Sequence, residues 1–237
     1  MRNSVYKRYI NNHNHWWFQA RKEIIKEVIK KNLSKNLKIL DFGAGTGINA
    51  KMLSKFGLVY MYEPHLKTQK FLKSEYNDKK KFKILNKISN MKFDLIILSD
   101  VLEHIKNDKD QIKKLNNNLN KNGHILITVP AYQFLFSSKD KALMHFRRYN
   151  KQEIKEIFKQ FNTIILTYYN FLLFLPAALA IIIFKILKFK FINTVENSPN
   201  QLISKILFNT FVVEKKFINV VNFPFGLSIF GLFKKNN

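Results

Sequence analysis

The sequence predicts an α/β fold built on a mostly parallel β-sheet. Short apolar runs that suit buried strands alternate with segments in which apolar residues recur at helical spacing. A glycine-rich turn at residues 43–47 joins the first apolar run to such a helical segment, which is typical of an α/β unit that binds a nucleotide. With 237 residues, the chain is long enough for one domain with a sizeable core and one elaboration.

The glycine turn ends the stretch LKILDFGAGTG, from Leu37 to Gly47. We expect a strand up to Phe42, then the turn, and then a helix from Ile48. Glycines let the backbone approach a ligand closely, and a helix N-terminus offers unpaired N–H groups with a partial positive charge. A second strand, residues 58–62, ends at Glu63, about 20 residues after the first glycine, where an acid that binds ribose hydroxyls is expected.

Further strands and helices follow by the same patterns. The run 93–98, apolar except for Asp94, is typical of a strand in the buried middle of a parallel sheet. We expect Gly123 to end one helix as its C-cap, and Asn150 with Glu153 to begin another as a capping box. The remaining strands are expected at 82–85, 124–129, 163–169 and 225–233, and the remaining helices at 16–29, 65–76, 112–119 and 154–161.

An apolar insertion separates the last two expected strands. Residues 171–184 carry no charge, and a more mixed segment follows at 202–220. A membrane span needs about 20 apolar residues, and Pro176 interrupts this shorter run, so we expect a helix at the membrane interface or a lid over the substrate. A dimer interface is the competing interpretation. The lysines expected to meet lipid headgroups are Lys185, Lys188 and Lys190.

Composition limits the classes of protein that the chain can represent. The absence of cysteine excludes a disulfide framework and a thiolate metal site, and no other set of metal ligands is predicted. The N-terminal stretch MRNSVYKRYINNHNHWW lacks the apolar region of a signal peptide. We therefore expect a cytoplasmic protein, with peripheral association at the inner face of the cytoplasmic membrane as a further expectation.

The chain is strongly basic, with a formal net charge of +25 at pH 7. Such a charge favours an anionic membrane surface or a nucleic acid as a partner. The lysines are dispersed, however, and no motif in which aromatic and basic residues read RNA is present. A genome that favours lysine codons explains the composition equally well, so nucleic acid is not expected as a partner.

Several motifs together resemble the class I S-adenosylmethionine-dependent methyltransferases. They are Asp41 before GAGTG, whose spacing is GxGxG and not the dinucleotide form GxGxxG, then Glu63, and the segment FDLIILSDVLEHI. HWWF, HFRRY and PFGLS make the sequence similar to a bacterial branch that acts on small molecules and lipid-linked glycans. The resemblance covers nearly the whole chain. It implies a Rossmann-like methyltransferase fold, with a seven-stranded, mostly parallel sheet, an antiparallel last strand, and a hydrophobic helical insertion before that strand.

The resemblance also implies how the chain is divided. We expect an N-terminal helical cap at 1–35, a cofactor-binding α/β domain at 36–170, an apolar helical insertion or lid at 171–222, and the last strand of the α/β domain at 223–237.

S-adenosylmethionine is the cofactor that the resemblance implies. Arg21, on the helix that covers the site in the family, is expected to meet the methionine carboxylate, although a packing helix with an exposed arginine is an equal alternative. Asn86 stands where the family usually places an acid or amide that contacts adenine. The residues expected at the cofactor are Trp17, Arg21, Asp41, Gly43, Ala44, Gly45, Gly47, Glu63, Pro64, Asn86, Ser99, Asp100, Val101 and His104.

Methyl transfer from a sulfonium is an in-line displacement, so holding the acceptor close and aligned supplies most of the catalysis. His104 and His145 are the candidates for a general base, and Tyr149 is expected to orient the acceptor. The long loop 131–150 is expected to be a lid in which Arg147 and Arg148 bind the substrate. The alternative is a loop that these arginines pin to backbone carbonyls.

The apolar insertion favours a hydrophobic acceptor that is membrane-associated or linked to a glycan or lipid. Two alternatives stay open: an RNA-directed methyltransferase or basic nucleic-acid-binding module, and a membrane-associated scaffold that binds the cofactor without catalysis. The expected partners are a small-molecule or lipid-linked substrate, an anionic membrane surface, and a second copy of the chain bound through the insertion.

Overall fold

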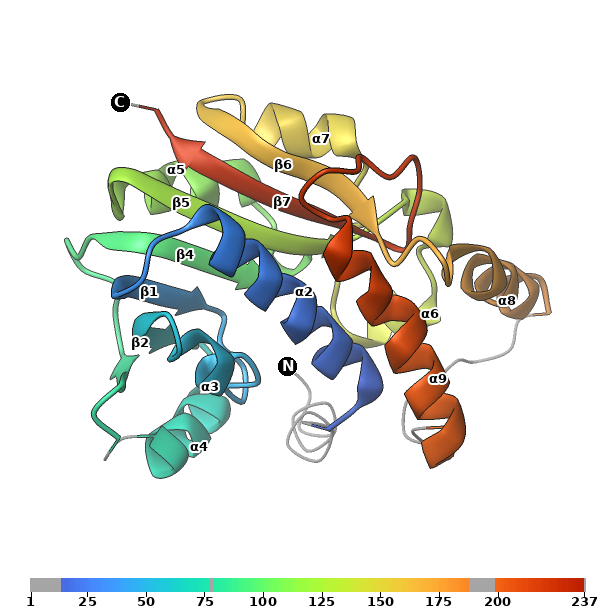
Figure 1. The fold of residues 1–237 in the computed structure, drawn as a ribbon, viewed down its shortest axis with the longest axis horizontal. Helices are drawn as coiled ribbons and strands as arrows, with labels where there is room; N and C mark the ends of the chain where they lie inside the picture. Colours follow the sequence, from blue (N-terminus) through green and yellow to red (C-terminus); the bar gives the residue numbers. More distant parts are fainter. Residues whose placement is uncertain (1–13, 77–78, 188–198, 237) are drawn as a thin grey trace.

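The computed structural model describes residues 14–76, 79–187 and 199–236, and it has a seven-stranded sheet with helices on both faces (Figure 1). The strand order is β3-β2-β1-β4-β5-β7-β6, and β7 runs antiparallel to both of its neighbours while the other pairs are parallel. This arrangement confirms the predicted fold class. The strands are β1 (Leu37–Phe42), β2 (Gly57–Tyr62), β3 (Phe82–Leu85), β4 (Phe93–Ser99), β5 (Leu119–Pro130), β6 (Phe161–Tyr169) and β7 (Ser228–Lys235).

The helices divide between the two faces of the sheet. Buried residues of α2, α3, α4 and α9 share one apolar cluster with the sheet, and those of α5 and α7 share the other. The helices are α2 (Trp16–Asn32), α3 (Ala50–Leu53), α4 (Leu66–Tyr76), α5 (Asp108–Asn117), α6 (Ser138–Ala142), α7 (Lys151–Ile157), α8 (Phe174–Ile186) and α9 (Gln201–Val212), with 3-10 turns at η1 (Leu102–His104), η2 (Gln133–Leu135) and η4 (Val213–Lys216).

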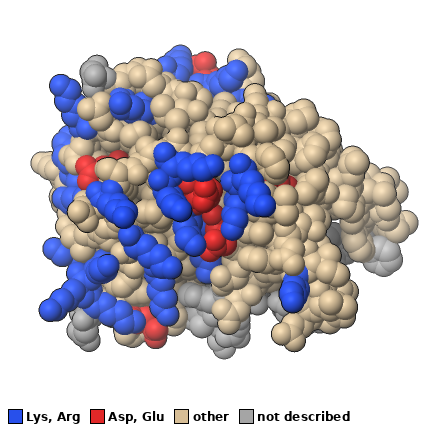
Figure 2. Space-filling view, in the orientation of Figure 1, with Lys and Arg blue, Asp and Glu red and all other residues tan. Residues whose placement is uncertain are grey.

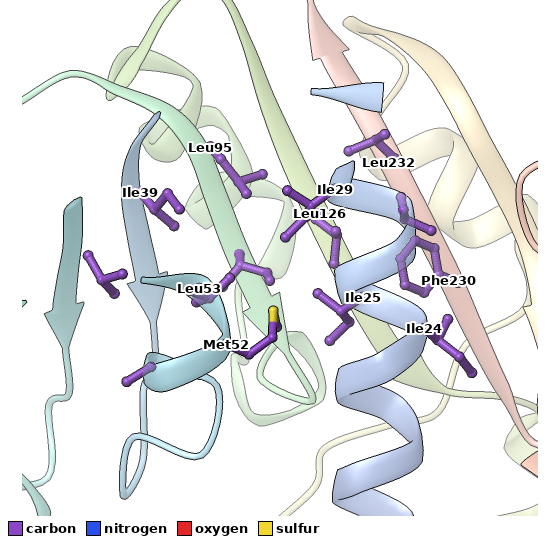
Figure 3. Close-up of a cluster of buried hydrophobic side chains, with 14 of the residues drawn as sticks. Ile24, Ile25, Ile29, Ile39, Met52, Leu53, Leu95, Leu126, Phe230 and Leu232 are labelled. Carbon is purple, nitrogen blue, oxygen red and sulfur yellow. The ribbon is translucent and has the colours of Figure 1, made fainter. Parts of the chain in front are cut away.

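Helix α2 lies across the sheet and buries one side of its surface against it. Figure 3 shows Ile24, Ile25 and Ile29 directed from α2 toward the strands, where Leu126 and Phe230 belong to the same cluster. The helix begins at His15, whose Nδ1 accepts a hydrogen bond from the Trp17 N–H at 3.2 Å. This packing fixes α2 beside the carboxyl ends of the central strands, where the site lies.

The opposite face is covered by α5 and α7. The predicted capping box at the start of α7 is present, because the Glu153 N–H donates to Asn150 Oδ1 at 2.9 Å and the Asn150 N–H donates to Glu153 Oε2 at 2.8 Å. At the end of α7, the ring of Phe158 stacks on Phe233 of β7 with 4.0 Å between ring centroids. The two layers of helices therefore bury the middle of the sheet from both sides.

Several local predictions are wrong. Leu119 and Phe161, expected at the ends of two helices, are the first residues of β5 and β6. The helix after the glycine turn was expected from Ile48, but α3 is only the four residues Ala50–Leu53, because turns continue through Asn49. Gly123 is not a helix C-cap, because α5 ends at Asn117 and Gly123 lies inside β5. A Cβ at Gly123 would lie 3.0 Å from the Phe93 carbonyl oxygen, so the small residue serves the close approach of β5 to β4.

The apolar insertion forms a helix, α8, beginning at Phe174. Among the residues that the structure describes, none of the helices combines the length and the apolar character needed to cross a bilayer. Lys185, expected at lipid headgroups, donates to the Phe134 carbonyl oxygen at 3.3 Å. Lys188 and Lys190 lie outside the described residues.

Candidate active site

The site lies where β1, β2 and β4 end. Strand β1 pairs with β2 on one side and with β4 on the other. The order of the strands along the sheet therefore reverses beside β1. Ligands of open α/β sheets bind in the crevice at such a reversal of strand order. The three strands bring the glycine turn, Glu63 and Asp100 together there.

The glycine turn and Glu63 are joined by hydrogen bonds. The Gly45 N–H donates to Glu63 Oε2 and the His65 N–H donates to Oε1, both at 2.9 Å. Gly43, Gly45 and Gly47 have φ angles of 74°, 55° and 77°, which glycine adopts without strain. A Cβ at Gly45 would meet no atom within 4 Å, so this part of the turn faces open space. The predicted acid therefore lies at the predicted turn.

An ion pair of a buried arginine connects α2 to the residue that follows β4. Arg21 donates to Asp100 Oδ2, and only 4% of the Arg21 side chain is exposed. Asp100 adopts a φ of 55°, and its Oδ1 accepts a hydrogen bond from Thr128 Oγ1 at 2.8 Å. Arg21, expected to meet the cofactor carboxylate, is thus buried and paired within the protein, which disagrees with the alternative of an exposed arginine.

Asp41, near the end of β1, is a buried acid of the crevice. It is 1% exposed, and its Oδ2 has no hydrogen-bond partner. Burial raises the pKa of Asp41 to about 7; the positive charge of Arg21 opposes this shift and the negative charge of Glu63 adds to it. This buried carboxylate oxygen has no hydrogen-bond partner in the protein, so it can bind a polar or cationic group of a ligand.

Glu103, His104 and His145 form a second group beside the crevice. Glu103 is fully buried, and neither carboxylate oxygen has a hydrogen-bond partner. Burial raises its pKa to about 8, against the proximity of its own backbone N–H and the charges of Arg21 and Arg148. Burial, and after it the neighbouring His145, lower the pKa of His104 to about 4. The two imidazole rings meet edge to face, with 4.6 Å between centroids, so the structure brings both predicted general bases together.

The loop that carries His145 is held by Asp140. Arg148 donates from Nε and an Nη atom to the two carboxylate oxygens of Asp140, at 2.9 and 3.0 Å, and Asp140 Oδ1 lies 2.9 Å from His145 Nδ1. Although burial opposes ionisation, these hydrogen bonds and the Arg148 charge hold the pKa of Asp140 well below its usual range. Arg148 therefore orients the loop by way of Asp140.

Arg147 and Tyr149 are anchored in the same way. Arg147 donates to Asp108 Oδ2 at 2.9 Å and to the Lys106 carbonyl oxygen at 2.8 Å. The Tyr149 hydroxyl, 2% exposed, donates to Asp108 Oδ2 at 2.9 Å, and burial raises its pKa well above the usual range. This hydroxyl therefore bonds within the protein, and its expected role in orienting the methyl acceptor stays a prediction. The contacts of both arginines match the alternative of a pinned loop, and their role toward a substrate stays a prediction.

The remaining predicted residues divide between the crevice and its surroundings. Val101 packs on the turn, because a Cβ at Gly43 would lie 2.8 Å from its Cγ2, and Ala44 is buried within the turn. Ser99 Oγ lies 3.3 Å from Thr128 Oγ1. Trp17 packs on Phe211 of α9, with 5.0 Å between ring centroids. Pro64 and Asn86 are exposed, and Asn86 Oδ1 accepts a hydrogen bond from Lys73 at 3.0 Å.

Three residues of this region were not in the predicted set: Glu103, Thr128 and Asp140. Glu103 had a visible signal, since it is the second acid in the DVLEH segment that follows a buried strand. Thr128 had none, because its partner Asp100 becomes a neighbour through folding. Asp140 lies in the same long loop as its partners His145 and Arg148, which was the signal for it.

The geometry defines a nucleotide-binding α/β domain with a glycine turn after its first strand and an acid after its second. A family model described as a methyltransferase domain matches residues 13–167. The chain belongs to this family and is an S-adenosylmethionine-dependent methyltransferase, as predicted. A comparison with curated proteins finds no match.

Solved structures share the fold at low sequence identity. A TehB-like SAM-dependent methyltransferase from Corynebacterium glutamicum is 14% identical, with a TM-score of 0.53, over 91% of this chain and 88% of that chain. Phosphoethanolamine N-methyltransferase 2 from Haemonchus contortus, in complex with S-adenosyl-L-methionine, is 18% identical, with a TM-score of 0.57, over 90% of this chain and 52% of that chain. The YcgJ protein from Bacillus subtilis is 13% identical, with a TM-score of 0.58, over 91% and 98%.

The family and the neighbour solved with the methyl donor support S-adenosylmethionine as the cofactor. The residues of the crevice fit this molecule, which carries sugar hydroxyls and two cationic groups. Glu63 offers carboxylate oxygens at the turn, Asp41 has a buried oxygen without a partner, and the turn is open above Gly45.

Proposed function

We propose that this enzyme transfers a methyl group from S-adenosylmethionine to a hydrophobic acceptor at a membrane surface, such as a lipid or a lipid-linked glycan. The glycine turn, Glu63 and Asp41 hold the donor, and Asp100 with Arg21 closes the crevice from the side of α2. The acceptor approaches from the side of Glu103, His104 and His145. The observation that supports this acceptor class is the exposed apolar surface of α8.

Helix α8 is apolar around its circumference but buries only Ala178. Lys185 is its single charged residue, and α9 likewise has Lys205 alone. An exposed apolar surface of this size indicates a partner. The large apolar side chains that α8 exposes are Leu175, Leu179, Ile182, Ile183 and Ile186.

The size and charge of this part of the molecule suit a membrane surface. A 13-residue helix is about 20 Å long, shorter than the roughly 30 Å hydrocarbon core, so α8 would lie in the interface plane. In the view of Figure 2, charged side chains gather over α2, α3 and α4, whereas the end formed by α8 and α9 shows few charges. Each Leu or Ile that enters the lipid contributes about 1.5–3 kcal/mol, so a few such side chains suffice for measurable binding.

Catalysis in this proposal depends on position and proton removal. S-adenosylmethionine supplies an electrophilic methyl carbon, and the protein aligns the acceptor with it. His104, kept neutral by its lowered pKa, accepts a proton from an acceptor hydroxyl or amine. His145 lies against His104 and is fixed by Asp140, so it limits the positions of the ring.

Liposome flotation tests the membrane-facing role of α8. The wild type should float with anionic vesicles, whereas a Leu175→Glu/Ile186→Glu variant should float much less. Leu66→Glu on α4 is the matched control, because Leu66 is 72% exposed and Leu175 is 68% exposed. The wild type would instead have α8 at a subunit interface if it does not float with the vesicles and sediments as a dimer, while the double variant sediments as a monomer.

The acceptor class is tested with labelled methyl donor. Extract from the host cell is separated into membrane and soluble fractions, and each is incubated with the wild type or with a Glu63→Ala variant. We expect label to enter an organic-extractable compound of the membrane fraction only with the wild type. Label confined to a water-soluble compound or to RNA would reject the proposed acceptor while leaving the methyltransferase assignment intact.

A further inference from the structure

Glu103, His104 and His145 converge next to the crevice. Each offers one ligand atom, a carboxylate oxygen or an imidazole nitrogen, and these three atoms lie within 4.8 Å of one another. Glu103 and His104 belong to η1, just after β4, whereas His145 belongs to the loop between α6 and α7. Folding therefore gathers a set of ligands that is dispersed in the sequence.

Both histidines are oriented by a hydrogen bond to one ring nitrogen. His145 Nδ1 lies 2.9 Å from Asp140 Oδ1, and the His104 ring hydrogen-bonds to the backbone of Met144. A metal-binding histidine almost always gives one N–H to a carboxylate or carbonyl in this way, which fixes the tautomer and presents the lone pair of the other nitrogen. The two rings thus have the support that metal ligands need.

Glu103 provides an independent observation. The residue is fully buried, and both of its carboxylate oxygens lack a hydrogen-bond partner. A buried acid without partners is costly, and a bound cation removes that cost. The nearest cationic side chains do not fill this role, because Arg21 pairs with Asp100 and Arg148 pairs with Asp140.

We propose that Glu103, His104 and His145 bind a divalent first-row transition-metal ion, such as Zn²⁺. Two imidazoles and one carboxylate suit such an ion, and three protein ligands leave a coordination position open. Donor atoms of a tetrahedral zinc site lie about 3.4 Å apart, so binding draws the three side chains together. The partial exposure of His104 and His145 provides a path for the ion.

The metal site stands on these contacts and does not require a particular acceptor. Its catalytic consequence does rest on the proposed function, with one change: a His104 that binds the ion no longer accepts the proton. The ion would instead bind an acceptor hydroxyl and lower its pKa, so that the proton passes to water.

Zinc titration of the 237-residue chain tests the site. Protein freed of metal with a chelator is titrated with Zn²⁺ against a chromophoric competitor, and bound metal is counted by mass spectrometry after desalting. We expect one ion per chain, and at least a tenfold loss of affinity in each of the variants Glu103→Gln and His145→Asn. His65→Asn is the matched control, because His65 contacts Thr68 outside the cluster, and it should bind as the wild type does.

Cobalt provides a second measurement that does not depend on activity. Co²⁺ should give visible absorption bands in the wild type and in His65→Asn, and these bands should be absent in Glu103→Gln. Thermal unfolding of each variant with S-adenosylmethionine shows whether the donor site is intact. If the wild type binds no metal, or if all variants bind it equally, the proposal is overturned and the cluster is a hydrogen-bonded network. If S-adenosylmethionine does not raise the Tm of the wild type, that result contradicts the proposed function instead.

Discussion

The Asp41→Asn substitution should change how stability depends on pH. In the folded chain the Asp41 pKa is about 7, raised from 3.8 chiefly by burial. The folded state therefore keeps this proton between about pH 4 and 7, where the unfolded state has lost it, and wild-type stability falls as pH rises through that range. About three pKa units at about 1.4 kcal/mol each give a change of about 4 kcal/mol, which the asparagine variant lacks.

Urea unfolding at several pH values between 4 and 8 measures this effect. The free energy of unfolding of Asp41→Asn minus that of the wild type should rise by about 4 kcal/mol from pH 4 to pH 8. The test is how the difference in unfolding free energy changes with pH. The buried amide of the variant also alters its stability, but by an amount that does not depend on pH. Asp110→Asn is the control for the loss of one charge, since the Asp110 side chain is 63% exposed. A difference between Asp41→Asn and wild type that stays flat with pH would refute the reasoning.

Two further predictions concern the donor and the packing of α9. S-adenosylmethionine should raise the Tm of the wild type, because it binds only the folded state, and Gly45→Leu or Glu63→Ala should lose most of that shift; unchanged shifts in both variants would place the donor elsewhere. Phe211→Ala should lower the free energy of unfolding by about 3–5 kcal/mol, because the ring is fully buried and packs 5.0 Å from Trp17. Phe217→Ala, at an exposed position, should change it by less than about 1 kcal/mol, and equal losses would contradict this account.

The sheet and the donor crevice could be predicted because their signals are local. Each strand is an apolar run in the sequence, and β4 in particular is continuous from Leu95 to Leu98. The glycine turn and Glu63 follow consecutive strands, so the rule that parallel strands end at the same edge brings them together. Their hydrogen bond at 2.9 Å agrees with that reasoning.

The roles of individual side chains near His145 could not be predicted in the same way. Arg147 pairs with Asp108, which lies 39 positions away, and Arg148 binds Asp140 within its own loop. A sequence shows that two arginines are present but not which acid each one faces. The sequence favoured the substrate role and left the pinned loop as the alternative; the contacts match the pinned loop, and the substrate role stays a prediction.

The sequence by itself determined the class of fold, the reaction class and the edge of the sheet at which the glycine turn meets Glu63, because strand period, glycine spacing and residue type act over a few neighbouring residues. Only the tertiary structure decided that Arg21 pairs with Asp100, that Glu103 is buried without a partner, and that His104 meets His145. These features depend on contacts between distant segments, where burial and pairing set the state of each charged group.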